Sequence, residues 1–302
     1  MDSFDIRNNV LYKVFASSRE ITIPNEVLET ICSNDMEKGE RPCIEVKYKN
    51  RIRTINFGSR IQNISICLYK YCFNLEYINV DVNNMHYTSI DGVLYDKYVK
   101  TLLHYPANKK GKELILPSSV IRLFDSSFFY NRHLEKVVIP NHVRIIDDFA
   151  FEESELLKEI ILHDGNLEIC HGAFGWCRKL EGVIKIPFNI KKLHTMFIGC
   201  GKLEEVILPE GLEEIGTDTF SGCSNLRKLV IPSNVKKIGG QAFLECESLE
   251  KIIIPRSVEE INSEAFDGCK NLTIYCEVDK KPKTWHKEWN SSRCKVIWGY
   301  KG

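Results

Sequence analysis

A spacing of 23 residues governs most of this chain. Phenylalanine recurs at that interval at Phe128, Phe151, Phe174, Phe197, Phe220, Phe243 and Phe266. Cysteine keeps the same interval three residues later, at Cys177, Cys200, Cys223, Cys246 and Cys269. A third register holds Pro117, Pro140, Pro187, Pro209, Pro232 and Pro255, with His163 where one more proline would stand. Three registers with one period predict a solenoid, in which each coil buries its apolar side chains only by stacking on its neighbours.

Each unit is predicted to contain a short strand and a turn. In residues 249–269, apolar side chains alternate at Ile252 and Ile254, which is typical of a strand with one buried face. Pro255 ends this strand because proline has no N–H for a ladder. Counted back from the proline, the first and third residues are expected in the core, and the second and fourth on the exposed face. Phe266 and its equivalents are expected to form a ladder along the convex side.

Two units carry a recognisable pattern. The segments VILPEGLEEIGTDTFSGC (206–223) and LVIPSNVKKIGGQAFLEC (229–246) resemble BspA-type leucine-rich repeats, whose pattern is I-x-I-P-x-x-V-x-x-I-G-x-x-A-F-x-x-C. The resemblance covers about residues 52–276. It implies a leucine-rich-repeat solenoid, a curved right-handed stack of coils with a parallel β-sheet on the concave side and short turns or 3-10 segments on the convex side.

We predict a single domain in three parts. Residues 1–51 are an N-terminal cap with an irregular first coil, 52–276 are the repeats, and 277–302 are a C-terminal cap. A hairpin insertion at about 83–106, with arms near 93–95 and 101–105, accounts for the long interval between Asp81 and Pro117. Trp285 and Trp289 are expected to cover the end of the stack, because the last coil of a solenoid needs a cap.

The chain has 12 cysteines, and most belong to the ladder. We predict that the ladder is reduced and structural, because parallel Cβ directions on adjacent coils keep the Cβ atoms farther apart than the ~3.8 Å of a disulfide. Asn131 and Ser154 occupy the same position in two coils, which favours a small turn residue there. Cys276 and Cys294 remain candidates for a bridge if the protein is exported. Cys32 and Cys43, which bracket the irregular N-terminal loop, stay ambiguous.

We expect no metal, no cofactor and no catalytic residue. The neighbours His163, Cys170, His171 and Cys177 lack the paired C-x-x-C spacing of zinc sites. Nucleophile, metalloprotease and phosphate-binding motifs such as G-x-S-x-G, H-E-x-x-H and the Walker A string do not occur in the sequence. The sequence therefore favours a binding protein over an enzyme.

The charge balance and the distribution of apolar residues indicate which kinds of partner and which cellular location to expect. Lys+Arg and Asp+Glu are both 41, and this balance argues against a nucleic-acid binder with a strongly positive face. No apolar run approaches the ~18 residues of a membrane span. The first residues lack the apolar segment of a secretion signal. We expect a cytoplasmic monomer, or a secreted or cell-surface protein if the natural chain carries an export signal outside this sequence.

A candidate protein-binding stripe follows from the strand register. The second residue before each proline position is apolar with one exception, in the series Val138, Ile161, Lys185, Ile207, Val230 and Ile253. The fourth residue before it is mostly charged, and includes Glu205, Lys228 and Lys251. An apolar stripe with charged edges is typical of a protein contact. Alternatively, β-branched residues fill the stripe only because they make good strands.

The hairpin insertion is a second candidate contact surface. Tyr95 and Tyr98 are predicted to contact a partner there. Alternatively, its tyrosines pack the hairpin onto its own coil. The leading prediction is a non-enzymatic scaffold that binds a protein on the concave sheet. The resemblance implies an alternative, a cell-surface adhesin-like protein that binds a host protein or a glycan.

Overall fold

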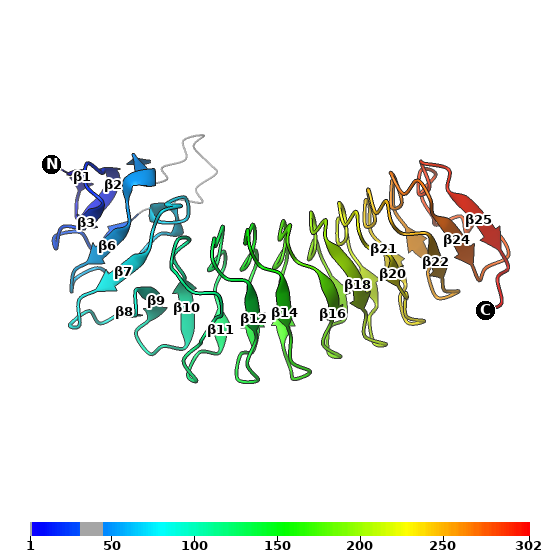
Figure 1. The fold of residues 1–302 in the computed structure, drawn as a ribbon, viewed down its shortest axis with the longest axis horizontal. Coiled ribbons are helices and arrows are strands. Elements are labelled where there is room, and N and C mark those ends of the chain that lie inside the picture. The colour runs from blue at the N-terminus through cyan, green and yellow to red at the C-terminus, as the bar shows by residue number, and fades with distance from the viewer. Residues whose placement is uncertain (1, 31–44) are drawn as a thin grey trace.

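The computed structural model describes residues 2–30 and 45–302. Within these residues the chain winds into a β-solenoid, and its coils stack into an arc with the two termini at opposite ends (Figure 1). The predicted leucine-rich-repeat solenoid is thus confirmed. No α-helix occurs in the described part of the chain. The expected irregular loop around 31–43, with Cys32 and Cys43, lies outside the described residues.

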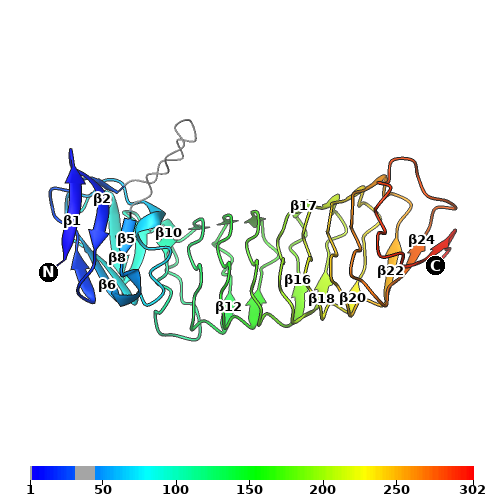
Figure 2. The same cartoon turned by 90° about the horizontal axis from the view of Figure 1, so that it is seen from above.

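A first series of strands, one from most coils, lies along one side of the stack (Figure 2). Its pairs are parallel, and Lys136 lies opposite Glu159 as the 23-residue period requires. In Figure 1 these strands face the viewer as one flank of the arc and do not line its concave edge, where the sheet was expected, so we call their exposed surface the first face. The series comprises β3 (Glu20–Thr22), β6 (Thr54–Phe57), β7 (Tyr77–Val80), β12 (Lys136–Val138), β14 (Glu159–Ile161), β16 (Gly182–Lys185), β18 (Leu203–Ile207), β20 (Lys228–Leu229), β22 (Lys251–Ile254), β24 (Thr273–Cys276) and β25 (Lys295–Trp298).

A second series of two-residue strands follows the proline position in most coils. In Figure 2 its members lie across the stack from the first series, as β17 does from β16. They also pair in parallel, and Lys192 lies opposite Glu214. The second series comprises β4 (Glu29–Thr30), β11 (Arg122–Leu123), β13 (Ile145–Ile146), β15 (Glu168–Ile169), β17 (Lys192–Leu193), β19 (Glu214–Ile215), β21 (Lys237–Ile238) and β23 (Glu260–Ile261).

Two regions depart from the regular coil. At the N-terminus, β1 (Ser3–Arg7) pairs antiparallel with β2 (Val10–Phe15), which pairs parallel with β4 and β5 (Glu45–Lys47). The insertion forms three antiparallel strands and joins the second series where Leu102 lies opposite Leu123. The two predicted arms are present, and a third strand precedes them. These strands are β8 (Tyr87–Ile90), β9 (Val93–Asp96) and β10 (Thr101–His104); two 3-10 helices are η2 (Lys49–Arg51) and η3 (Ile66–Leu68).

The core of the repeats is a continuous stack of phenylalanine rings. From Phe128 to Phe266 successive ring centroids are 4.5–5.9 Å apart, and every ring is fully buried. Trp289 closes the C-terminal end with its ring edge-on, 6.0 Å from Phe266. Tyr105 precedes the stack at the other end, 5.2 Å from Phe128. The phenylalanine period therefore marks the buried ladder that the sequence predicts.

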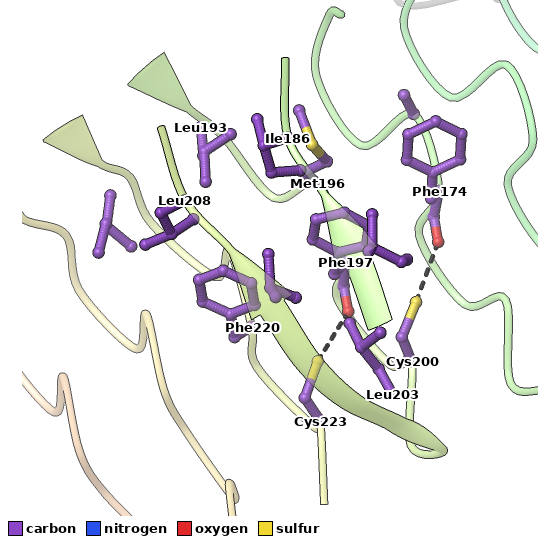
Figure 3. Close-up of a cluster of buried hydrophobic side chains, with 14 of the residues drawn as sticks. Phe174, Ile186, Leu193, Met196, Phe197, Cys200, Leu203, Leu208, Phe220 and Cys223 are labelled. Carbon is purple, nitrogen blue, oxygen red and sulfur yellow. Dashed lines mark hydrogen bonds between the residues drawn. The ribbon is translucent and has the colours of Figure 1, made fainter. Parts of the chain in front are cut away.

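The laddered cysteines are buried free thiols with a hydrogen-bonding role (Figure 3). Cys200 Sγ donates to the carbonyl oxygen of Phe174 at 3.2 Å, and Cys223 Sγ donates to that of Phe197 at the same distance. Ser154 fills the same slot, and its hydroxyl donates to the Phe128 carbonyl at 3.2 Å. This position of the repeat thus holds a small side chain that donates a hydrogen bond to the buried phenylalanine carbonyl of the preceding coil. Burial also raises the pKa of the Cys177 thiol to about 12, which leaves it a poor nucleophile at neutral pH.

Candidate binding surface

Side chains on the first face alternate as the strand register predicts. Val137 and Ile139 are buried, whereas Val138 between them is 45% exposed. Ile161 and Ile207 are about as exposed as Val138, Val230 is 71% exposed, and Ile253 is half-buried. We call this series the apolar stripe. Its members lie on neighbouring coils, so they form one band across several strands.

The stripe begins one coil earlier than the sequence analysis placed it. Ile115 stands two residues before Pro117 and is 89% exposed. Its segment forms no regular strand and is tied to β12 by a single bridge between Glu113 and Lys136. Ile115 also lines a hollow of about 370 Å³ beside the hairpin, together with Tyr105 and other residues. Counting two residues back from Pro117 would have found it.

The same face is polar at its N-terminal end. Asn56 and Asn79 occupy the stripe position in β6 and β7, and Asn79 Nδ2 donates to Asn56 Oδ1 at 2.8 Å. Asn56 Nδ2 in turn donates to Glu20 Oε1 at 2.7 Å. This amide ladder satisfies its own hydrogen bonds from coil to coil. At the stripe position, exposed apolar side chains therefore begin at Ile115.

The charged residues beside the stripe mostly neutralise one another. Lys228 Nζ lies 2.6 Å from Glu205 Oε1 on the neighbouring strand. Lys185, the exception within the stripe, lies 2.5 Å from Asp164, and Val183 of the same strand is exposed beside it. Lys251 extends over the Tyr275 ring, 4.9 Å from its centroid. The edge predicted from Glu205, Lys228 and Lys251 therefore presents paired rather than free charge.

The hairpin offers fewer exposed contact residues for a partner than the sequence predicts. Tyr98 is 79% exposed at the turn between β9 and β10 and stays available to a partner. Tyr95 is only 3% exposed and belongs to the main core, so its prediction as a contact residue is wrong. Tyr95 is buried because both faces of β9 are covered: Val93 and Tyr95 pack into the main core, and Leu94 packs into the N-terminal core cluster. Buried Lys109 ties the hairpin to the stack, with Nζ 2.8 Å from Asp91 Oδ2.

Other candidate sites are occupied by structural contacts. Cys177 Sγ donates to the Phe151 carbonyl, and His163 Nε2 lies 3.0 Å from the Val143 carbonyl. Cys276 and Cys294 are both free thiols, and Cys294 Sγ lies 3.4 Å from the Cys269 carbonyl. Among residues 2–30 and 45–302, no group of three His, Cys, Asp or Glu side chains could hold a metal ion. The same residues contain no helix long and apolar enough to cross a membrane.

Comparison with known families agrees with this geometry. The model of the BspA type leucine-rich repeat region matches residues 107–199 and 194–276, which is more than half of the chain. The chain belongs to the BspA-type leucine-rich repeat family. Repeats of this kind commonly serve as binding scaffolds and generally lack catalytic activity. Comparison with curated proteins gave no significant match.

Solved structures of bacterial proteins share the fold. A leucine-rich repeat protein from Eubacterium ventriosum is 26% identical, with a TM-score of 0.71; the match covers 89% of this chain and 67% of that one. The pneumococcal vaccine antigen PcpA is 18% identical, with a TM-score of 0.54, over 93% of this chain and 67% of that one. At this low identity, the likeness to the antigen concerns the fold alone.

Proposed function

We propose that this protein is a scaffold that binds a protein partner on the apolar stripe of its first face. The observation that carries the proposal is the exposure of large apolar side chains at one position of successive coils, from Ile115 at 89% to Val230 at 71%, with Lys185 as the one interruption and Val183 exposed beside it. Contiguous apolar surface of this kind marks interaction sites in soluble proteins, whereas single exposed apolar residues do not. At its Ile115 end, the apolar stripe adjoins the hollow that Ile115 lines.

Strand propensity alone accounts poorly for the stripe. Asn56 and Asn79 fill the same position in β6 and β7, both of which are four-residue strands paired along their whole length. Asparagine is among the residues depleted in strands. Because these coils form without a β-branched residue at that position, the sheet does not require one. The apolar residues from Val138 to Ile253 therefore support binding rather than folding alone.

We predict that Ile207→Lys combined with Val230→Glu abolishes capture of the partner and leaves the fold intact. Both side chains are exposed, so the free protein tolerates the charges, whereas an apolar interface would have to desolvate them. The measurement compares proteins captured from source-cell extract by quantitative mass spectrometry. Ile121→Lys is the matched control, because Ile121 is 45% exposed, as Ile207 is, but immediately precedes β11 of the second series and lies outside the stripe. A partner retained equally by all three proteins would contradict the proposal.

We also propose a reducing compartment, the cytoplasm, as the location. Support comes from the buried thiols, which donate to backbone carbonyls, and from Cys276 and Cys294, which are free. We expect protease applied to intact source cells to leave the protein undigested until lysis. Digestion without lysis would instead favour the adhesin-like alternative on the cell surface, and would make a Cys276–Cys294 bridge worth testing in the isolated protein.

A further inference from the structure

A second surface of the solenoid lies over the turns that carry the phenylalanine ladder. In each of these turns the residue two positions after the phenylalanine has a positive φ, between 54° and 73°. We call this position the post-Phe slot. Side chains there stand outside the ladder, so their identity shapes the outer surface of the turns. From coil to coil the slot holds Tyr130, Glu153, Trp176, Gly199, Gly222, Glu245 and Gly268.

On two successive coils the post-Phe slot holds a glycine, and the missing side chains leave a hollow in this surface. Gly199 and Gly222 leave bare backbone as part of its lining, and Trp176 and Glu245 stand in the same slot on the coils at either end. The hollow has a volume of about 740 Å³, within the range of roughly 300–1,000 Å³ that is common for small-molecule sites. Trp176 lies directly over Gly199, because a Cβ placed on that glycine would collide with the indole. The glycine therefore fixes the position of the aromatic wall.

Polar side chains surround the indole. Asp218, Gln241 and Ser221 line the hollow, as do the basic residues Arg178 and Lys202. The Arg178 guanidinium lies 5.3 Å from the centroid of the Trp176 ring. Gln241 Nε2 donates to Glu264 Oε2 at 2.7 Å, so the amide is held in place. Partial burial raises the pKa of the Asp218 carboxyl, as expected of a group drawn away from water.

The backbone of the hollow is already satisfied. The Gly199 N–H donates to the Ser221 carbonyl and the Gly222 N–H to the Leu244 carbonyl, both at 2.7 Å. These donors belong to the ladder between coils, so they cannot pair with an added peptide strand. The acidic residues Asp218 and Glu245 are balanced by the basic residues Arg178 and Lys202, so the lining carries no excess formal charge that would favour a charged ligand. Recognition in the hollow must therefore come from the indole and from side-chain donors and acceptors.

We propose that this hollow binds a neutral oligosaccharide. A pyranose ring presents C–H groups that pack on an indole, and hydroxyl groups that both donate and accept hydrogen bonds. Trp176 offers the aromatic surface, Asp218 and Glu245 offer acceptors, and Lys202 and Ser221 offer donors. The site lies on the turns of the phenylalanine ladder and is separate from the apolar stripe. It assigns this protein a second ligand, independent of a protein partner.

An extended sugar chain fits better than a single sugar. A second hollow of about 470 Å³ lies on the other side of Trp176 and shares Arg178 with the first. Tyr130 and Leu156 line it, so a second aromatic side chain stands two coils from Trp176. A ligand that crosses Trp176 would reach both hollows. We therefore assign the site to a chain of several sugar units.

The test is titration calorimetry of the full chain with cellotetraose, chitotetraose, maltotetraose and mannotetraose. We expect at least one tetrasaccharide to bind, and Trp176→Ala to weaken its binding about tenfold, the loss expected for ~1.4 kcal/mol of aromatic contact. Phe188→Ala is the control, because Phe188 is an exposed aromatic residue outside both hollows. Binding of none of the four sugars, or equal binding by the Trp176 variant, would overturn the proposal.

Gly222→Gln provides an independent variant. Trp176 and Glu245 show that the post-Phe slot accepts a side chain at φ of 58°, and a Cβ on Gly222 would meet its nearest atom at 3.4 Å. The glutamine therefore has room to fill the hollow, although a side chain at the φ of 73° of Gly222 adds some backbone strain. We expect it to abolish sugar binding with an unchanged circular dichroism spectrum. The Ile207→Lys, Val230→Glu protein should bind the sugar normally, so failure of either proposal leaves the other intact.

Discussion

Phe220→Ala is expected to lower the free energy of unfolding by about 3–5 kcal/mol, the usual cost of truncating a buried aromatic residue. The Phe220 ring is fully buried between Phe197 and Phe243, with centroids 5.9 and 5.5 Å away. Its removal leaves a cavity between two coils whose contacts hold the stack together. Because solenoid stability is carried by interfaces between neighbouring repeats, the loss cannot be shared with distant coils.

Denaturant unfolding followed by circular dichroism measures this effect. Phe188→Ala is the matched control, because Phe188 is 65% exposed and its truncation should change stability by no more than about 0.5 kcal/mol. Equal unfolding midpoints for the Phe220 variant and the unmodified protein would contradict the assignment of the phenylalanine ladder as the core of the repeats.

Acid is expected to destabilise the protein through His104. This side chain is buried in β10 and stacks on Tyr69, with ring centroids 4.2 Å apart. Neither ring nitrogen has a hydrogen-bond partner among the described residues. Burial, assisted by the nearby charge of Lys70, lowers the pKa of His104 to about 3. The folded protein therefore holds a neutral imidazole at pH values where the unfolded chain, with a pKa of about 6.5, is protonated.

The direction of the pH dependence follows from this difference. Above pH ~6.5 both states are neutral and His104 causes no loss of stability. As the pH falls from ~6.5 toward the folded pKa, only the unfolded state binds the proton, and stability drops by about 1.4 kcal/mol per pH unit, or about 2 kcal/mol at pH 5. Unfolding midpoints between pH 8 and 5 measure the loss. His104→Phe keeps a stacking ring without a titratable group, so an equally steep loss in that variant would contradict this account.

The sequence predicted the repeats well because their signals are local and repeated. In most repeats the proline follows a strand, and the residues at one and three positions before it are buried, as Ile139 and Val137 show. The second series was not predicted, because a two-residue strand is too short to show alternation. The third hairpin strand, β8, was missed for a similar reason: its partner is set by the hairpin fold rather than by the period.

The candidate surfaces were predicted less well, because exposure depends on neighbouring coils. Tyrosine is a common contact residue, yet the face of β9 that carries Tyr95 packs into the main core. Trp176 occupies a position that varies between glycine and large side chains, so no pattern marks it. Its role depends on Gly199 one coil later, a relation that the folded stack creates. Such pairs become visible only when coils are placed side by side.

Ion pairs along the second series constrain how this gene can change in length. Lys192, Glu214, Lys237 and Glu260 alternate in sign from coil to coil, with nitrogen–oxygen distances of 3.4, 3.8 and 3.6 Å. Deletion of one repeat would bring two like charges together, whereas deletion or duplication of two repeats restores the alternation. Each exposed pair contributes only about 0.2–1 kcal/mol, but the repulsion recurs wherever the order is broken. Recombination within these coils should therefore be tolerated best in steps of two repeats.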